Sequence, residues 1–309
     1  MTDLAPLPVG APRRLVYLGT PHMAVAPLEA LVAAGFEVAL VVTRADKRRG
    51  RGAELAPSPV KAAAQRLGVP VSHVVADAVG AGADLGVVVA FGQLVRPDVL
   101  AALPMVNLHF SLLPRWRGAA PVERSLLAGD ETTGVCLMQL EVGLDTGGIL
   151  DRIEVPIGAR QTADDLRRVL VDVGTTQLVD NLRRGLGDAV PQFGEPTYAA
   201  KLDPAEFVID WSRPAVEIDR LVRLGVAWTW FRGKRLKVLE TEPGASDGAP
   251  ASGAFLAPLS VACWQSTLTL VRVQPEGKPP MPALAWANGA RPTSADVFGV
   301  APAAASDAS

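Results

Sequence analysis

Long apolar stretches are missing from this sequence. No run approaches the roughly 18 residues that a transmembrane helix needs. Residues 1–12 also lack the basic start and apolar segment of a secretory signal peptide. These two absences predict a cytoplasmic protein.

Cysteine and histidine are both scarce. Cys136 and Cys263 are far apart and no CxxC pair occurs, which argues against a disulfide framework and against a cysteine zinc site. The three histidines, His22, His73 and His109, are scattered and no carboxylate cluster stands beside them at ligand spacing, so no metal is predicted. Any chemistry that uses an imidazole must use one of these three, and we expect His22 and His73 to be structural or exposed.

An excess of positive charge is also absent, because the formal net charge is −2. A nucleic-acid partner must therefore be bound by local patches. Two basic segments are present: RADKRRGR at residues 44–51, and residues 220–237, which carry six Lys or Arg and no acid. On composition alone, such segments are more often solvated faces than binding sites.

The 309 residues, 49% of them hydrophobic, are enough for two domains. Short β-branched runs alternate with segments of helical periodicity, which is typical of a doubly wound α/β domain with a mostly parallel, Rossmann-like sheet. Strands are predicted at residues 14–18, 38–43, 85–90, 106–109 and 133–139, and helices at residues 24–34, 59–67, 121–128 and 162–182. In the second helix, Ser58 is a candidate N-cap and Pro59 the first helical residue. No GxGxxG motif occurs, which argues against a dinucleotide cofactor.

Gly and Pro interrupt this pattern around residues 183–207, which indicates a linker. Short β-type runs follow it and predict a small barrel or sandwich, with strands at residues 235–240, 254–256, 259–264 and 267–273. The predicted organisation is a disordered N-terminal extension at 1–12, an α/β domain at 13–190, a linker at 191–209, a β domain at 210–300 and a disordered tail at 301–309.

One constellation carries candidate chemistry. Asn107 and His109 are two residues apart on a predicted strand, so their side chains project from the same face. The strand continues into NLHFSLLPRWRG, and LDTG follows at residues 144–147. An isolated histidine near a loop is more often structural, but an amide and an imidazole pointing together at a strand end raise the weight of a catalytic interpretation.

NLHFSLLPRWRG and GVCLMQLEVGLDTGGIL resemble the signature of the folate-dependent formyltransferases. Further motifs extend the resemblance over about residues 13–295 and make it specific for methionyl-tRNA formyltransferases: GTP at 19–21, SPVK at 58–61, RGAAP at 117–121, IDW at 209–211 and VQPEGK at 273–278. The chain departs from that pattern at His22, Phe91, Phe110 and Gly148, which bears on substrate detail rather than on the class of reaction.

The resemblance implies transfer of a formyl group from 10-formyltetrahydrofolate to the methionyl amino group of initiator Met-tRNA, with Asn107, His109 and Asp145 as the catalytic trio. An amide can donate to the oxyanion that forms, and an imidazole suits proton transfer near neutral pH. Asp145 either orients His109 or, if burial raises its own pKa, acts as the base. The sequence leaves this choice open.

The resemblance also assigns the binding residues. Two loops are expected to hold the folate co-substrate, namely Ser111, Leu112, Leu113 and Pro114, and Phe91, Gly92, Gln93 and Leu94. The Gly-Arg-Gly loop around Arg51 is expected to enter the acceptor end of the tRNA, while Lys47, Arg48 and Arg49 contact phosphates. Arg44 is also expected to bind the tRNA. Arg232, Lys234 and Arg235 are expected to continue this track onto the second domain, which is OB-like and binds tRNA in the family.

Three other interpretations remain at this point. A sugar-nucleotide N-formyltransferase shares the trio and the folate pocket but does not need a basic Gly-Arg-Gly loop. Glycinamide ribonucleotide formyltransferases normally end without a second domain. A non-catalytic tRNA-binding protein of this fold would not need to keep Asn107, His109 and Asp145. The resemblance further implies a monomer.

Overall fold

The computed structural model describes residues 4–49, 54–245 and 251–301. The predicted tail at 301–309 therefore falls, apart from Ala301, outside the described residues. The chain divides into two compact units, which are described separately. The first contains the described residues of Met1–Val122, Glu131–Ile157 and Asp165–Lys201, and the second those of Glu123–Asp130, Gly158–Asp164 and Leu202–Ser309.

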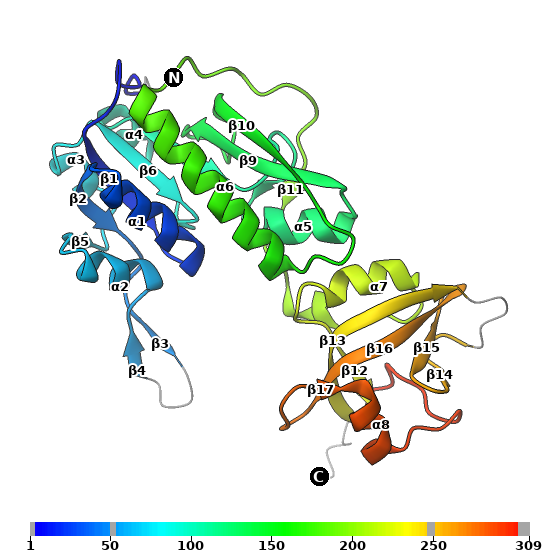
Figure 1. Ribbon diagram of the computed structural model, residues 1–309. Helices are drawn as coiled ribbons and strands as arrows, with labels where there is room; N and C mark the ends of the chain where they lie inside the picture. The colour runs from blue at the N-terminus through cyan, green and yellow to red at the C-terminus, as the bar shows by residue number, and fades with distance from the viewer. Residues whose placement is uncertain (1–3, 50–53, 246–250, 302–309) are drawn as a thin grey trace, which may run out of the picture. The chain divides into compact units, whose positions relative to one another are not determined.

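A seven-stranded sheet forms the centre of the first unit (Figure 1), in the order β10-β9-β7-β6-β1-β2-β5. Its strands are β1 (Arg14–Gly19), β2 (Glu37–Val42), β5 (Val71–Ser72), β6 (Leu85–Val89), β7 (Met105–His109), β9 (Thr132–Gln139) and β10 (Ile149–Pro156). Five adjacent strands of the sheet are parallel, in the order β7-β6-β1-β2-β5. In contrast, β9 and β10 are antiparallel to their neighbours. The predicted mostly parallel, Rossmann-like sheet is confirmed.

Helices cover this sheet, so its central strands are buried on both faces. Every residue of β6 and β7 is buried, as expected for strands of continuous apolar sequence. The helices are α1 (Val25–Ala33), α2 (Pro59–Arg66), α3 (Asp77–Gly80), α4 (Pro97–Ala102) and α6 (Ala163–Arg184). The predicted cap of α2 is confirmed, because Ser58 Oγ accepts the backbone N–H of Lys61 at 3.0 Å. In α6, a Cβ on Gly174 would lie 3.1 Å from side-chain atoms of Leu108 and Val135, so this helix packs closely on β7 and β9.

The order of the strands reverses between β1 and β6. From β1 the chain moves outward through β2 and β5, and it then returns to the other side of β1 for β6 and β7. Ligands of such sheets bind at the carboxyl ends of the strands on either side of this reversal. The loops 91–94 and 111–114 leave the carboxyl ends of β6 and β7, so both predicted folate loops lie at this edge.

Two small ladders complete the first unit. β3 (Lys47–Arg49) pairs with β4 (Glu54–Ala56) in an antiparallel hairpin, where the sequence predicted only a basic loop. β8 (Arg117–Gly118) pairs in parallel with β11 (Tyr198–Ala199). The short helix η1 (His22–Ala24) also lies in the first unit, whereas η2 (Pro204–Phe207) and most of α5 (Pro121–Ala128) cluster with the second.

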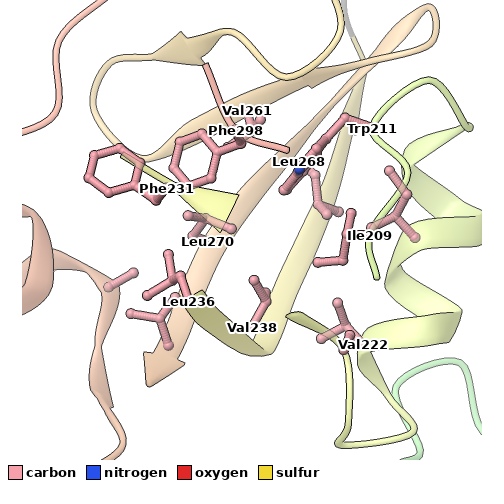
Figure 2. Close-up of a cluster of buried hydrophobic side chains, with 14 of the residues drawn as sticks. Ile209, Trp211, Val222, Phe231, Leu236, Val238, Val261, Leu268, Leu270 and Phe298 are labelled. Carbon is pink, nitrogen blue, oxygen red and sulfur yellow. The ribbon is translucent and has the colours of Figure 1, made fainter. Parts of the chain in front are cut away.

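An antiparallel sheet in the order β12-β13-β16-β15-β14 forms the second unit, and β17 pairs with β16. The strands are β12 (Trp228–Phe231), β13 (Lys234–Ala245), β14 (Phe255–Leu256), β15 (Ser260–Cys263), β16 (Ser266–Pro275) and β17 (Met281–Pro282). α7 (Ala215–Val222) and α8 (Ala283–Ala290), which the sequence did not predict, pack against it. Figure 2 shows the core, in which Trp211, Phe231 and Phe298 join aliphatic residues of the sheet. The buried indole of Trp211 donates to Thr229 Oγ1 at 2.9 Å, so its polar atom is satisfied.

No helix in the described part of the chain is long and apolar enough to span a membrane.

Candidate active site

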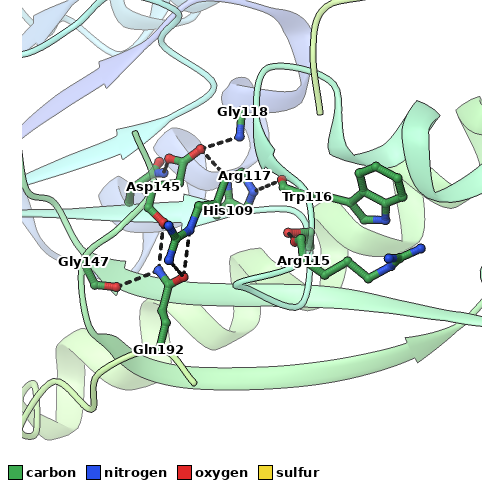
Figure 3. A network of polar contacts seen from close by, with 10 residues as sticks. His109, Arg115, Trp116, Arg117, Gly118, Asp145, Gly147 and Gln192 are labelled. Atoms are coloured by element: carbon green, nitrogen blue, oxygen red, sulfur yellow. Dashed lines mark hydrogen bonds and ion pairs between the residues drawn. The ribbon is translucent and has the colours of Figure 1, made fainter. Parts of the chain in front are cut away.

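The structure brings together the three residues predicted to be catalytic. Asn107 and His109 lie on the same face of β7 and are buried, with 8% and 5% of their surface exposed. Asp145 approaches them from the loop between β9 and β10. Asn107 Nδ2 donates to Asp145 Oδ1 at 3.4 Å. His109 Nδ1 lies 3.6 Å from Asp145 Oδ2 (Figure 3). An amide, an imidazole and a carboxylate therefore meet near the carboxyl end of β7.

A backbone donor holds the Asp145 carboxylate. Its Oδ2 accepts the N–H of Gly118 at 2.7 Å. Gly118 has a φ of +120°, and a Cβ there would lie 2.9 Å from the carbonyl oxygen of Ala199. Only glycine combines this conformation with so close an approach of β11. Asp145 itself has a φ of +50°, an uncommon conformation for a residue with a side chain.

The contacts of His109 define which nitrogen carries hydrogen. Its Nε2 lies 2.9 Å from the carbonyl oxygen of Trp116. A carbonyl can only accept, so Nε2 is the donor in this arrangement. Nδ1 is then left to face Asp145 Oδ2 across 3.6 Å.

Gln192 is a site residue that the sequence analysis missed. Its Nε2 donates to the carbonyl oxygens of Asp145 and Gly147, both at 2.8 Å. Its Oε1 accepts from Nη2 and Nε of Arg117 at 2.7 and 3.1 Å. Figure 3 shows the amide between the Asp145 loop and the β8 strand. No local pattern marks this glutamine, because it lies in a Pro- and Gly-rich segment that reads as a linker.

The first predicted folate loop, residues 111–114, follows β7 directly. Ser111 is buried and its hydroxyl donates to the carbonyl oxygen of Arg115 at 2.6 Å. Leu113 is buried against Cys136 and Met138. Leu112 and Pro114 are partly exposed. Ser111 and Leu113 thus anchor the loop, while the other two residues can face a ligand.

The second predicted folate loop follows β6. Phe91 is buried, and its carbonyl accepts the Thr20 hydroxyl at 3.2 Å, which ties the loop to the end of β1. Gly92, with a φ of +68°, and Gln93 are exposed, and Leu94 has 79% of its surface exposed. Exposed backbone and an apolar side chain at the reversal of strand order suit a flat heterocycle with hydrogen-bonding edges.

Other ionisable groups buried in this unit are poorly suited to proton transfer. Burial raises the pKa of the Cys136 thiol to about 11. Burial also raises the pKa of the Tyr17 phenol well above its ordinary value, and its hydroxyl donates to the carbonyl of Ala24 at 2.6 Å. Among the described residues, no group of three or more His, Cys, Asp or Glu side chains is placed to hold a metal ion.

Of the basic residues predicted on the first unit, those that the structure describes lie on β3 or just before it. Lys47 and Arg48 are exposed on β3, which also includes Arg49, and Arg51 lies outside the described residues. Arg44 instead donates to the carbonyl oxygen of Gly92 in the second folate loop. One guanidinium predicted to bind tRNA therefore contacts the loop predicted to bind folate.

The basic residues predicted on the second unit have three different surroundings. Arg232 is held by the Asp296 carboxylate at 2.6 and 2.7 Å, and the guanidinium lowers the pKa of that carboxyl. Arg235 stacks on Trp228, with its Cζ 4.3 Å from the ring centroid. Lys234 is exposed at the start of β13. Lys234 and Arg235 present positive charge at the surface, whereas the charge of Arg232 is largely compensated.

Models of known families match both units. The model described as "Formyl transferase" matches residues 13–182, and that described as "Formyl transferase, C-terminal domain" matches residues 201–291. The chain is 43% identical over 294 residues to a protein of Roseobacter denitrificans named methionyl-tRNA formyltransferase, covering 89% of this chain and 95% of the relative. A protein of Clavibacter sepedonicus with the same name is 43% identical, with 92% and 99% covered.

Solved structures share the fold at low sequence identity. An N-formyltransferase from Helicobacter canadensis, in complex with folinic acid and dTDP-3-aminofucose, has a TM-score of 0.62 and 17% identity, covering 84% of this chain and 98% of that chain. HypX from Aquifex aeolicus, in complex with tetrahydrofolic acid, has a TM-score of 0.60 and 13% identity, covering 90% and 47%. These structures therefore share the fold of this chain but little of its sequence.

Proposed function

The chain belongs to the methionyl-tRNA formyltransferase family, and we propose that it transfers the formyl group of 10-formyltetrahydrofolate to the methionyl amino group of initiator Met-tRNA. The observation that carries the proposal is the meeting of Asn107, His109 and Asp145 at the strand ends beside the two folate loops. The enzyme acts as a monomer and works in the cytoplasm, where translation initiates.

The reaction requires an oxyanion to be stabilised and a proton to be moved. The methionyl nitrogen bonds to the formyl carbon, whose oxygen becomes negatively charged. The bond from that carbon to N10 of the folate then breaks, and tetrahydrofolate leaves with a proton on N10. The product is N-formylmethionyl-tRNA, and the nitrogen has lost one proton.

Asn107 supplies a donor for the oxyanion. Its side-chain amide has two N–H groups. One of them donates to Asp145 Oδ1, and this hydrogen bond is long, with 3.4 Å between Nδ2 and Oδ1. The other N–H can be given to the oxygen that develops charge. Removing a comparable amide donor costs about 3 kcal/mol of transition-state stabilisation in other acyl-transfer sites.

His109 and Asp145 receive and deliver the proton as a pair. Since Nε2 faces the Trp116 carbonyl, Nδ1 and Asp145 Oδ2 are the atoms of the pair left to accept the proton. A proton taken from the attacking nitrogen can bind there and later be returned to N10. The pair therefore acts as one acid–base unit.

The two substrates approach from different parts of the chain. The pterin lies against the backbone of residues 91–94, and the loop 111–114 holds the folate beside Asn107. Arg51 enters the acceptor end of the tRNA, and Lys47, Arg48 and Arg49 contact phosphates beside it. Lys234 and Arg235 extend this phosphate track. Arg44, through its bond to Gly92, joins the two binding regions.

The test is formyl transfer by the purified protein with initiator and elongator Met-tRNA in parallel. Rapid formylation of the initiator alone is expected, and Asn107→Ala should lower the rate by about 100-fold or more because the oxyanion donor is lost. Arg51→Ala should impair use of the tRNA more than binding of folate. Formylation of an amino-sugar nucleotide but of neither tRNA would overturn the proposed acceptor.

A further inference from the structure

The segment from residue 190 to residue 199, here called the strap, contacts both sides of the His109–Asp145 pair. Val190 exchanges two backbone hydrogen bonds with Ile149, at 2.7 and 2.9 Å, just after the Asp145 loop. At its other end, the strap forms β11 and pairs with β8. The linker of the sequence analysis is therefore, in the described structure, an ordered support of the site.

The backbone groups that hold the pair are themselves contacted by the strap. The carbonyl of Trp116 accepts from His109, and the N–H of Trp116 donates to Thr197 Oγ1 at 2.9 Å. The N–H of Gly118 donates to Asp145, and Gly118 lies against Ala199. The carbonyl of Asp145 accepts from Gln192.

Gln192 is the strap side chain that joins the Asp145 loop to β8. Both hydrogens of its Nε2 are used on the Asp145 loop, and its Oε1 receives two bonds from Arg117. Arg117 immediately precedes Gly118, whose N–H binds the Asp145 carboxylate. The Gln192 amide thus completes a closed ring of hydrogen bonds. This ring runs from the backbone of Asp145 through Arg117 and Gly118 and back to the Asp145 carboxylate.

This ring explains how Asp145 keeps a positive φ while its carboxylate points at His109. A residue in that conformation is retained only where surrounding contacts determine it. We infer that Gln192 is a positioning residue of the formyl transfer: it fixes the Asp145 backbone so that Oδ2 stays within reach of both Gly118 and His109. The kinetic part of this inference rests on the proposed function.

Two substitutions at the same position separate the contacts. Gln192→Ala removes all four hydrogen bonds. Gln192→Glu keeps an acceptor for Arg117 but loses both donors and turns a negative oxygen towards the carbonyls of Asp145 and Gly147. The matched control is Gln161→Ala, because Gln161 uses its side-chain oxygen only to accept the N–H of Gly158 at 3.0 Å in the described structure, on a surface loop of the second unit.

Both Gln192 variants are expected to lower kcat by about 10- to 100-fold, since displacement of a catalytic group by about 1 Å can cost 100-fold. The KM for the folate should change by less than about twofold, because the loops 91–94 and 111–114 do not contact Gln192 through any hydrogen bond that the structure shows. A purely structural role would instead reduce the folded fraction and leave kcat per folded molecule unchanged.

The second readout does not depend on activity. With three histidines in the chain, the ring ¹⁵N signals of His109 can be assigned by comparison with a His109→Gln protein. These signals report the tautomer and the proton shared with Asp145. They should shift in both Gln192 variants and stay in place in Gln161→Ala.

The outcomes are distinct. Unchanged kcat per folded molecule, or a loss of kcat with the His109 signals unmoved, would overturn the positioning role. If the wild-type protein formylates no Met-tRNA, the proposed function fails, whereas shifted His109 signals in Gln192→Ala and Gln192→Glu would still support the role of Gln192 in fixing the pair.

Discussion

Asp145 Oδ2 accepts the backbone N–H of Gly118 at 2.7 Å and lies 3.6 Å from His109 Nδ1. One oxygen therefore serves a fixed backbone donor and a titratable ring at the same time. The bond to Gly118 sets the direction of the carboxylate, and the remaining lone pair faces the imidazole. The geometry of the pair is thus determined by the backbone of β8 as much as by the two side chains.

Replacement of Asp145 by Asn tests this arrangement. The amide retains the shape, but it can no longer hold a proton against His109, and an amide nitrogen turned towards Gly118 would place two donors together. We expect kcat to fall by about 100-fold or more, with little change in the KM for the folate. Asp98→Asn, at an exposed aspartate paired with Arg96, is the control and should retain full activity. Retention of activity by Asp145→Asn would remove Asp145 from the acid–base unit.

Gly118→Ala tests the close approach of β8 and β11. The added Cβ would meet the Ala199 carbonyl oxygen at 2.9 Å, and the φ of +120° disfavours any side chain. We expect a loss of about 2 kcal/mol in the free energy of unfolding, measured by urea titration, together with reduced kcat. Gly289→Ala, in α8 with no heavy atom within 4 Å of its Cβ position, should instead stabilise by about 0.5–1 kcal/mol. Equal stability of the two variants would contradict the assigned strain.

The site shows which parts of the fold the sequence encodes locally. Asn107 and His109 could be placed on one face because a strand has a period of two residues, and the cap at Ser58 is a local signal. Asp145 was found through a motif rather than through spacing. Gln192 and the pairing of β8 with β11 could not be predicted, because both depend on contacts between segments far apart in the chain.

Unit boundaries and charged residues illustrate the same limit. Residues 123–130 and 158–164 cluster with the second unit, although they interrupt the first in sequence. The basic run 220–237 contains guanidinium groups with different partners, and only the tertiary structure distinguishes Arg232, bound to Asp296, from Arg235, stacked on Trp228. Charge in a sequence therefore predicts a basic surface less well than periodicity predicts a strand.

The thiols should be inert in the folded protein. Burial raises the pKa of Cys136 to about 11 and that of Cys263 to about 12, so neither is a thiolate near neutral pH. An aromatic disulfide reagent should react with neither cysteine in buffer and with both in denaturant. Rapid reaction of one thiol in buffer would mean that its surroundings open easily.

Salt dependence of tRNA use tests the hairpin. Lys47→Ala and Arg48→Ala should each raise the KM for Met-tRNA and reduce the salt slope of binding by about one unit, since each removes about one phosphate contact. The KM for the folate should not change. Arg66→Ala, which removes an exposed arginine that ends α2 and is paired with Glu29, is the matched control. Equal effects of all three substitutions would indicate a general effect of net charge.

The ion pair between Arg232 and Asp296 predicts a pH-dependent stability. The Arg232 guanidinium, followed by the backbone and hydroxyl of Thr293, lowers the pKa of Asp296 in the folded state. Because the folded pKa lies below the unfolded value of about 4, the carboxylate stabilises the fold above that pH, and this contribution is lost as the pH falls towards the folded pKa. Asp296→Asn should therefore unfold at lower urea than the wild type near neutral pH, and the difference should shrink below about pH 4. A difference that is the same at both pH values would assign the effect to packing or to neutral hydrogen bonds instead of charge.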